Sequence, residues 1–150
     1  MNPDLLLFCV GVLLALGTGV FVGSEFALLN LDRADLERRT ARGEKGNRIT
    51  IAALKRTSTH LSSAQLGITL TTLLTGYTME PAISSMLAGP LTRAGLDDDF
   101  VRPVGAVAGI LIATTISMIF GELVPKNYAL AVPRQTARVL VPLQVAFTWV

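Results

Sequence analysis

The chain has 150 residues, of which 51% are hydrophobic, and its formal net charge is +2. This composition is far more apolar than that of an ordinary soluble domain and argues against that class of protein. The small net charge gives no reason to expect nucleic acid as a partner.

Three runs of the sequence lack Asp, Glu, Lys and Arg: residues 5–24, 57–79 and 103–121. Each run has 19 to 23 residues, and roughly 20 are needed to cross the hydrocarbon core as a helix. The sequence therefore predicts an all-α membrane protein with three transmembrane helices. We expect these helices over about 5–28, 60–80 and 104–123.

The basic residues predict the orientation of these helices. Eight Lys and Arg residues lie between the first two runs, whereas only Arg93 and Arg102 lie between the second and the third. Basic loops stay on the cytoplasmic side. We expect the N-terminus outside, the loop 31–56 and the C-terminus in the cytosol, and the protein in the plasma membrane, in bacteria the inner membrane.

The first predicted helix contains the stretch "GVFVGSEF". Gly19 and Gly23 form a small surface that allows another helix to approach closely, and Ser24 and Glu25 follow at its inner end. Good helix formers continue after this point. The helix is therefore expected to extend into the cytosol and to stop at glycines 43 or 46.

The second predicted helix carries a polar stripe spaced by three and four residues: Ser62, Gln65, Thr69, Thr72 and Gly76. In lipid, such a face turns either toward other helices or toward a wet cavity. After this helix, Pro81 and the Gly89-Pro90 pair are expected to bound a short separate helix.

The third predicted helix ends in "FGELVPK". Thr115, Met118 and Glu122 are expected to share one of its faces, and Gly105 and Gly109 allow close packing.

Pro125 has no amide to donate to the Gly121 carbonyl, so the sequence predicts a helix break, and a hinge, beside Glu122. A free carbonyl and a carboxylate suit a hard cation such as Mg²⁺. The alternative is a helix that simply ends with its acid among the lipid headgroups.

The tail from Pro133 to residue 150 begins with Arg134 and Arg138 and then becomes apolar. Its uncharged part is too short to span a bilayer, and Pro142 lies within it. We expect a juxtamembrane helix over about 133–150 that lies in the inner interface and contacts lipid. A cytosolic region is expected to follow residue 150.

Three stretches carry a family resemblance: "GSEFALLNLDRADLERR", "HLSSAQLGITLTTLLTGYTMEP" and "GELVPKNYAL". In this order they resemble the membrane domain of the CorC/HlyC family, whose animal relatives are the cyclin-M (CNNM) transporters. The resemblance implies a homodimeric magnesium exporter coupled to Na⁺ influx. It also implies a cytosolic pair of ATP-binding CBS modules after residue 150.

The resemblance also implies a set of metal ligands. Carried onto this sequence, they are Ser24, the Gly121 carbonyl and Glu122. On the second helix many relatives have asparagine within an "LGNTLVN" pattern, whereas this chain has Ile68 and Thr72 at the matching positions. Thr69 keeps the threonine that these relatives share. Either a threonine of this helix, Thr69 or Thr72, or Ser63 replaces the amide, or water completes the shell. Gln65 and Glu25 are expected as accessory polar groups.

Two other classes of function compete with a transporter. In a non-transporting metal-sensing regulator, the polar faces would only assemble the dimer. An intramembrane enzyme is not expected, because the sequence has no HExxH motif and no paired intramembrane aspartates.

Overall fold

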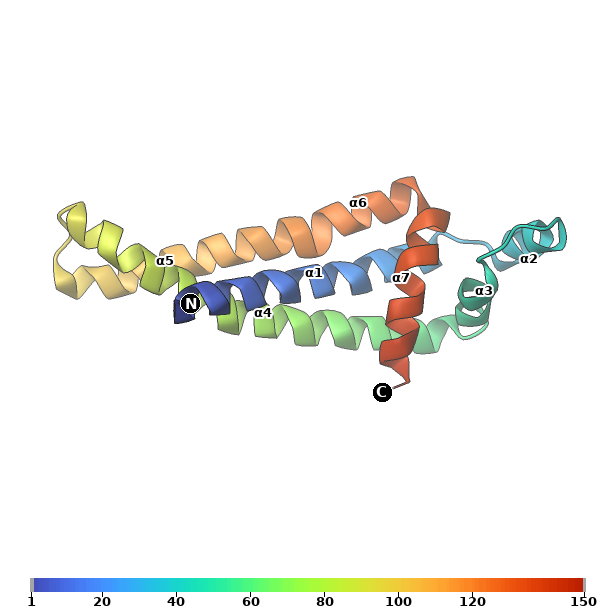
Figure 1. The fold of residues 1–150 in the computed structure, drawn as a ribbon, viewed down its shortest axis with the longest axis horizontal. Coiled ribbons are helices and arrows are strands. Elements are labelled where there is room, and N and C mark those ends of the chain that lie inside the picture. Colours follow the sequence, from blue (N-terminus) through green and yellow to red (C-terminus); the bar gives the residue numbers. More distant parts are fainter. Residues whose placement is uncertain (1, 150) are drawn as a thin grey trace.

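The computed structural model describes residues 2–149, and the regular structure in this range is helical, as the composition predicts. Three long rods run side by side: α1, α4 and a continuous rod made of α5, η1 and α6 (Figure 1). Helix α7 crosses them near one end, and α2 and α3 lie beyond that crossing (Figure 1). The elements are α1 (Pro3–Leu29), α2 (Arg33–Ala41), α3 (Arg48–Leu54), α4 (Thr57–Arg93), α5 (Asp98–Ile116), η1 (Ser117–Leu123), α6 (Val124–Ala131) and α7 (Pro133–Thr148).

Two of the rods are both long and apolar enough to cross a bilayer. They are Pro3–Leu29, with 27 residues, and Asp98–Ala131, with 34 residues. The second starts earlier and ends later than the predicted span 104–123. Helix α4 has 37 residues and contains the predicted span 60–80, but its many hydroxyl groups make it less apolar. Its passage through the bilayer therefore stays a prediction.

The expected extension of the first helix as far as glycines 43 or 46 is wrong, because the chain turns after Leu29. The Asn30 side chain donates to the Phe26 carbonyl at 2.8 Å. Asp32 then caps a new helix by accepting from the Ala34 amide at 3.0 Å. Asn and Asp compete with the helical backbone in this way, so two of them placed close together end one helix and start the next.

Helix α2 is held together by short-range ion pairs. Arg39 Nε lies 2.7 Å from Asp35 Oδ2, one turn away. The hydrogen bond from Arg39 holds the pKa of the Asp35 carboxyl below its usual range. Leu36 is the buried residue of this helix, so α2 is a mostly solvated segment outside the bundle.

The two proline positions of α4 do not bound a separate helix, which corrects the expectation for Pro81 and for the Gly89-Pro90 pair. The helix continues through both as far as Arg93. Helix α5 packs on this region so closely that a Cβ on Gly109 would lie 2.9 Å from the Glu80 carbonyl oxygen. A long packed neighbour of this kind keeps the helix continuous where isolated propensity would end it.

The glycine surface of α1 packs closely, as predicted. A Cβ on Gly19 would lie 2.8 Å from Pro125 Cγ, and a Cβ on Gly23 would lie 2.6 Å from Leu140 Cδ1. The Pro125 ring therefore fills a notch that two missing side chains leave on α1. This contact joins α1 to α6, whereas the predicted close packing of α5 through Gly105 and Gly109 joins α5 to α4.

Helix α7 starts at Pro133, as predicted, and Pro142 lies inside it without ending it. It packs on α1 through a buried cluster that includes Leu28 and Val141. The predicted last residue, 150, lies outside the described residues. The orientation of α7 across the rods is the one expected of a helix that lies along a membrane surface (Figure 1).

Candidate metal site

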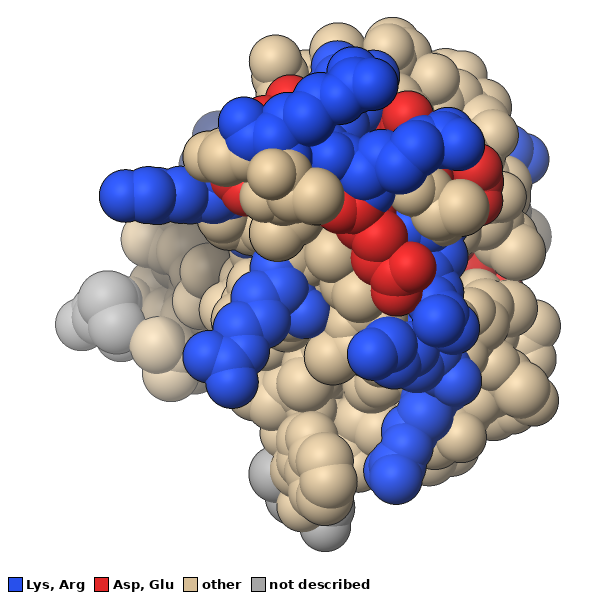
Figure 2. All heavy atoms as spheres, turned by 90° about the vertical axis from the view of Figure 1, so that its right-hand side faces the viewer, with Lys and Arg blue, Asp and Glu red and all other residues tan. Residues whose placement is uncertain are grey.

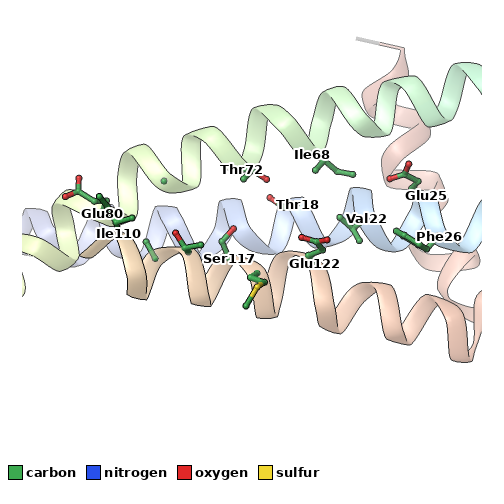
Figure 3. A pocket seen from close by; sticks show the side chains of 14 residues that line it. Thr18, Val22, Glu25, Phe26, Ile68, Thr72, Glu80, Ile110, Ser117 and Glu122 are labelled. Carbon is green, nitrogen blue, oxygen red and sulfur yellow. The ribbon is translucent and has the colours of Figure 1, made fainter. Parts of the chain in front are cut away.

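A cavity of about 690 Å³ lies between α1, α4 and the α5–η1 rod. Figure 3 shows side chains from all three rods pointing into it. Its polar lining comprises Thr18 and Glu25 of α1, Thr72 and Glu80 of α4, and Thr114, Ser117 and Glu122 of the third rod. Its apolar lining is Val22, Phe26, Ile68, Gly76, Ile110, Ala113 and Met118.

Glu122 reaches the cavity because the third rod widens there instead of breaking. Residues Ser117–Leu123 form a π-helix, in which the Val124 amide donates to the carbonyl of Ile119, five residues back. The predicted break at Pro125 is therefore corrected to a wider turn, and α6 begins directly after it. A proline is tolerated in the first turn of a helical segment, where its missing donor costs least.

The adjacent Gly121 faces a different neighbour. Gly121 is buried, and a Cβ there would lie 3.2 Å from the Ala15 carbonyl oxygen and 3.4 Å from Thr18 Cβ of α1. The glycine lets the wide turn press against α1, while the next residue presents its carboxylate to the cavity (Figure 3). The adjacent residues Gly121 and Glu122 thus combine a close backbone contact with α1 and a carboxylate in the cavity.

Three carboxylates line the cavity, and none of them has an ion-pair partner among residues 2–149. Glu25 and Glu80 lie at opposite ends, and Glu122 lies between them (Figure 3). The ion pairs of the described chain all join residues of the segment 33–44 to one another or to Arg134 and Arg138. The described chain therefore places no Lys, Arg or His at ion-pair distance from the acids in the cavity.

The hydroxyl groups beside Glu122 come from each rod. Thr18 Oγ1 lies 2.7 Å from Thr71 Oγ1, which joins α1 to α4 at the cavity wall. Thr72 and Ser117 present their hydroxyls from the two flanking rods (Figure 3). A carboxylate that shares a cavity with several neutral hydroxyl oxygens offers ligands of the kind that hard cations prefer.

Two residues predicted as metal ligands lie in a separate polar network beside α7. Ser24 Oγ donates to Gln144 Oε1 at 3.0 Å, and both residues have an exposed fraction of 0%. Gln144 Nε2 in turn donates to the His60 carbonyl at 2.6 Å. Ser63 Oγ accepts from Thr148 Oγ1 at 3.0 Å. Ser24 and Ser63 thus bind α7 in this conformation.

The remaining predicted residues are divided between the cavity and the surface of α4. Thr72 and Glu122 lie together in the cavity, with Glu25 at one end. Thr69 is exposed and donates to the Gln65 carbonyl at 2.9 Å, and neither residue lines the cavity. The structure brings two of the six predicted ligands, Thr72 and Glu122, into one space and packs Gly121 against α1.

Sequence reasoning missed Thr18, Glu80 and Ser117 as cavity residues. Thr18 precedes Glu25 by seven residues and Glu80 follows Thr72 by eight, so helical spacing could have placed both on the cavity faces. The third rod offered no such signal. The predicted face is right for Met118 and Glu122, which line the cavity, and wrong for Thr115, which donates to the Leu111 carbonyl of its own helix. Thr114 and Ser117 line the cavity instead.

The cavity does not resemble a site for soft or borderline metals. No three or more His, Cys, Asp or Glu side chains in residues 2–149 lie close enough together to hold a metal ion. Tetrahedral zinc sites need such a group, whereas Mg²⁺ binds one or two carboxylates and keeps several waters. The arrangement therefore favours a hard, partly hydrated cation.

Known proteins with a similar sequence cover almost the whole chain. The UPF0053 protein MT1890 of Mycobacterium tuberculosis is 43% identical over 135 residues, which are 90% of this chain and 30% of the relative. UPF0053 protein YhdT of Bacillus subtilis is 32% identical over 94% of this chain and 31% of the relative. UPF0053 protein sll0260 of Synechocystis is 32% identical over 91% of this chain and 30% of the relative. The chain thus spans about a third of these relatives' length.

The family comparison agrees with the helical architecture and with the resemblance in the sequence. Residues 9–150 match the family described as the Cyclin M transmembrane N-terminal domain. The match includes the π-helical turn, the polar face of α4 and helix α7. Together with the apolar rods, it shows that this is a domain of a membrane protein. The chain belongs to the Cyclin M transmembrane N-terminal domain family.

Proposed function

We propose that this chain is the transmembrane domain of a magnesium exporter and that the cavity between α1, α4 and η1 holds Mg²⁺ during transport. The observation that carries the proposal is Glu122, a carboxylate without an ion-pair partner in the described chain that lines a space shared by three helices. Ionisable groups inside membrane segments are costly and mark ion pathways.

In this proposal Glu122 supplies the charge that attracts the cation. The hydroxyls of Thr72 and Ser117 supply neutral oxygens, and water completes the octahedral shell that Mg²⁺ prefers. Glu25 and Glu80 make the two ends of the cavity attractive to a cation (Figure 3).

In this proposal, the metal ligands that the family resemblance implies reach the ion through a change of conformation. Ser24 and Ser63 are hydrogen-bonded to α7 in this structure. We propose that they reach the ion when α7 shifts, together with the Gly121 carbonyl. Thr69 would join from α4 in the same rearrangement. In alternating access, the hydroxyl groups of Ser24 and Ser63 would then bind α7 in one conformation and the ion in the other.

The proposal extends to the setting of the domain in the membrane and in the whole protein. We propose an N-terminus outside, a cytosolic C-terminus and a location in the plasma membrane, in bacteria the inner membrane. Na⁺ influx would drive export of the ion. The domain would act as a homodimer, regulated by cytosolic CBS modules that bind ATP and follow residue 150. The basic segment 33–56 is the sequence feature that supports this orientation.

The first test replaces Glu122 by Gln, which keeps the shape and removes the charge. We expect Mg²⁺ flux in proteoliposomes to fall at least about tenfold, because interactions with a charged group contribute roughly 1.5–3 kcal/mol. The matched control is Glu37→Gln, which removes a carboxylate from solvated α2. It should keep the flux within about twofold. Equal flux through Glu122→Gln and the unchanged protein would remove the carboxylate from the pathway.

A non-transporting metal sensor is the second candidate. The polar network that ties Ser24 to Gln144 favours it, because metal capture at Ser24 would release α7 without any passage of ions. Calorimetric Mg²⁺ binding that depends on Glu122, in a protein that gives no flux in proteoliposomes, would identify the sensor.

A further inference from the structure

A second cavity, of about 720 Å³, lies between α3, the start of α4 and α7. It shares no lining residue with the cavity around Glu122. Its lining is Gly46, Arg48, Ile49, Ala52, Ala53, Arg56, His60, Val145 and Trp149. Two arginines therefore open onto a space that is otherwise mostly apolar.

Both arginines are available to an external anion. The ion pairs within residues 2–149 include five other arginines but neither Arg48 nor Arg56. Both side chains are also exposed. Figure 2 shows that Lys and Arg side chains gather at this end of the molecule. Two arginines that line one cavity are suited to a phosphate group, which guanidinium groups bind through several hydrogen bonds.

The apolar part of the cavity continues away from the arginines. Ile49 is half-exposed, Val145 is partly buried, and the Trp149 side chain is 77% exposed. Tryptophan is enriched at membrane–water interfaces, where its ring contacts both headgroups and acyl chains. A free phosphate compound would gain nothing from these walls, whereas an acyl chain would bury its surface against them.

We propose that this cavity binds one anionic phospholipid, with its phosphate between Arg48 and Arg56 and an acyl chain against Ile49, Val145 and Trp149. The site joins α3 and α4 to α7, so a bound lipid would fasten α7 to the loop that precedes the second rod. Basic pockets at the cytoplasmic ends of membrane helices hold anionic headgroups for the same electrostatic reason. The proposal uses the membrane location of the family and does not depend on magnesium transport.

The chain contains a single tryptophan, so Trp149 reports directly on this cavity. The 150-residue chain is reconstituted in phosphatidylcholine vesicles that contain either brominated phosphatidylglycerol or brominated phosphatidylcholine at the same low mole fraction. Bromine quenches tryptophan fluorescence on contact. Salt at about 150 mM screens general attraction to the surface beyond roughly 8 Å. We expect brominated phosphatidylglycerol to quench at about tenfold lower mole fraction.

The variant Arg48→Gln/Arg56→Gln should lose this preference. Its matched control is Arg42→Gln/Lys55→Gln, which removes the same charge from exposed positions that do not line the cavity. Ala52→Phe narrows the apolar part without any change of charge and should also weaken quenching by the anionic lipid.

Three outcomes would overturn the lipid site. Equal loss in the two charge variants would show only general surface attraction. Equal quenching by the two brominated lipids would show no selectivity. Relief of quenching by millimolar glycerol 3-phosphate would assign the arginines to a soluble phosphate compound. Loss confined to Arg48→Gln/Arg56→Gln and Ala52→Phe, with no effect of glycerol 3-phosphate, is the result expected of a bound phospholipid.

Discussion

Single glycines decide how closely the rods of this domain approach each other. At Gly109 the nearest atom to an added Cβ would be a backbone oxygen, that of Glu80, at 2.9 Å. A backbone atom cannot rotate away as the end of a side chain can. At Gly89, on the neighbouring rod, an added Cβ would meet nothing within 4 Å. Glycine is therefore needed for close packing at position 109 but not at position 89.

The substitution Gly109→Ala is expected to destabilise the domain by about 1–3 kcal/mol, the usual cost of overpacking. Gly89→Ala is its control and should leave stability unchanged or raise it by up to about 1 kcal/mol, since alanine is the better helix former. Thermal unfolding in detergent measures both. If the two variants unfold at the same temperature, the contact between α5 and α4 is looser than the structure indicates.

Helix α7 is attached through one fully buried amide. Gln144 has an exposed fraction of 0% and hydrogen-bonds to Ser24 of α1 and to the His60 carbonyl of α4. Its removal would leave a buried hydroxyl and a buried carbonyl without partners, which costs roughly 1–3 kcal/mol. Gln144 therefore fixes the C-terminal half of α7 to both α1 and α4, beside the hydrogen bond that Thr148 donates to Ser63.

Gln144→Ala is expected to raise the rate of amide hydrogen exchange in α7 about tenfold, since local opening becomes cheaper. Gln135→Ala, at an exposed position of the same helix, should leave these rates unchanged. Exchange followed by mass spectrometry makes the comparison. Similar rates in both variants would mean that the apolar cluster around Val141 alone holds α7.

Some elements could be predicted from the sequence because their signals are local. The charge-free runs located the rods, Pro133 located the start of α7, and the paired glycines of α1 located a close contact. Other elements depend on partners that a single segment does not reveal. The rod α4 passes two prolines because α5 supports it, and Ser24 turns to α7 because Gln144, 120 residues away in the chain, receives its hydrogen bond.

At the scale of the whole molecule, α4 leaves polar groups uncovered. Ser62, Gln65 and Thr69 are exposed in the isolated chain and do not line the cavity. Hydroxyl and amide groups at membrane depth need partners, because lipid supplies none. A second copy that packs along this face would supply them and is the arrangement that the proposed homodimer requires.

Cysteine cross-linking tests this arrangement after Cys9, the chain's single cysteine, has been replaced. Thr69→Cys on the polar face of α4 is expected to form a disulfide-linked dimer in the membrane. Leu111→Cys, which is exposed on α5, should stay monomeric. Readout is by electrophoresis without reductant. Cross-linking through Leu111→Cys alone would show that the dimer contact lies on α5 and not on α4.

The π-helical turn has a consequence for which of two neighbours faces the cavity. In a regular helix with 3.6 residues per turn, position 121 would lie about 20° from the direction of Ile110, and position 122 about 120° away. Gly121 would then face the same direction as Ile110, which lines the cavity, and Glu122 would face away from that direction. The surplus residue of the wide turn reverses this order, since Glu122 lines the cavity while Gly121 rests on α1. One additional residue in the turn thus places the carboxylate of Glu122, instead of the hydrogen atom of Gly121, on the cavity side of the rod.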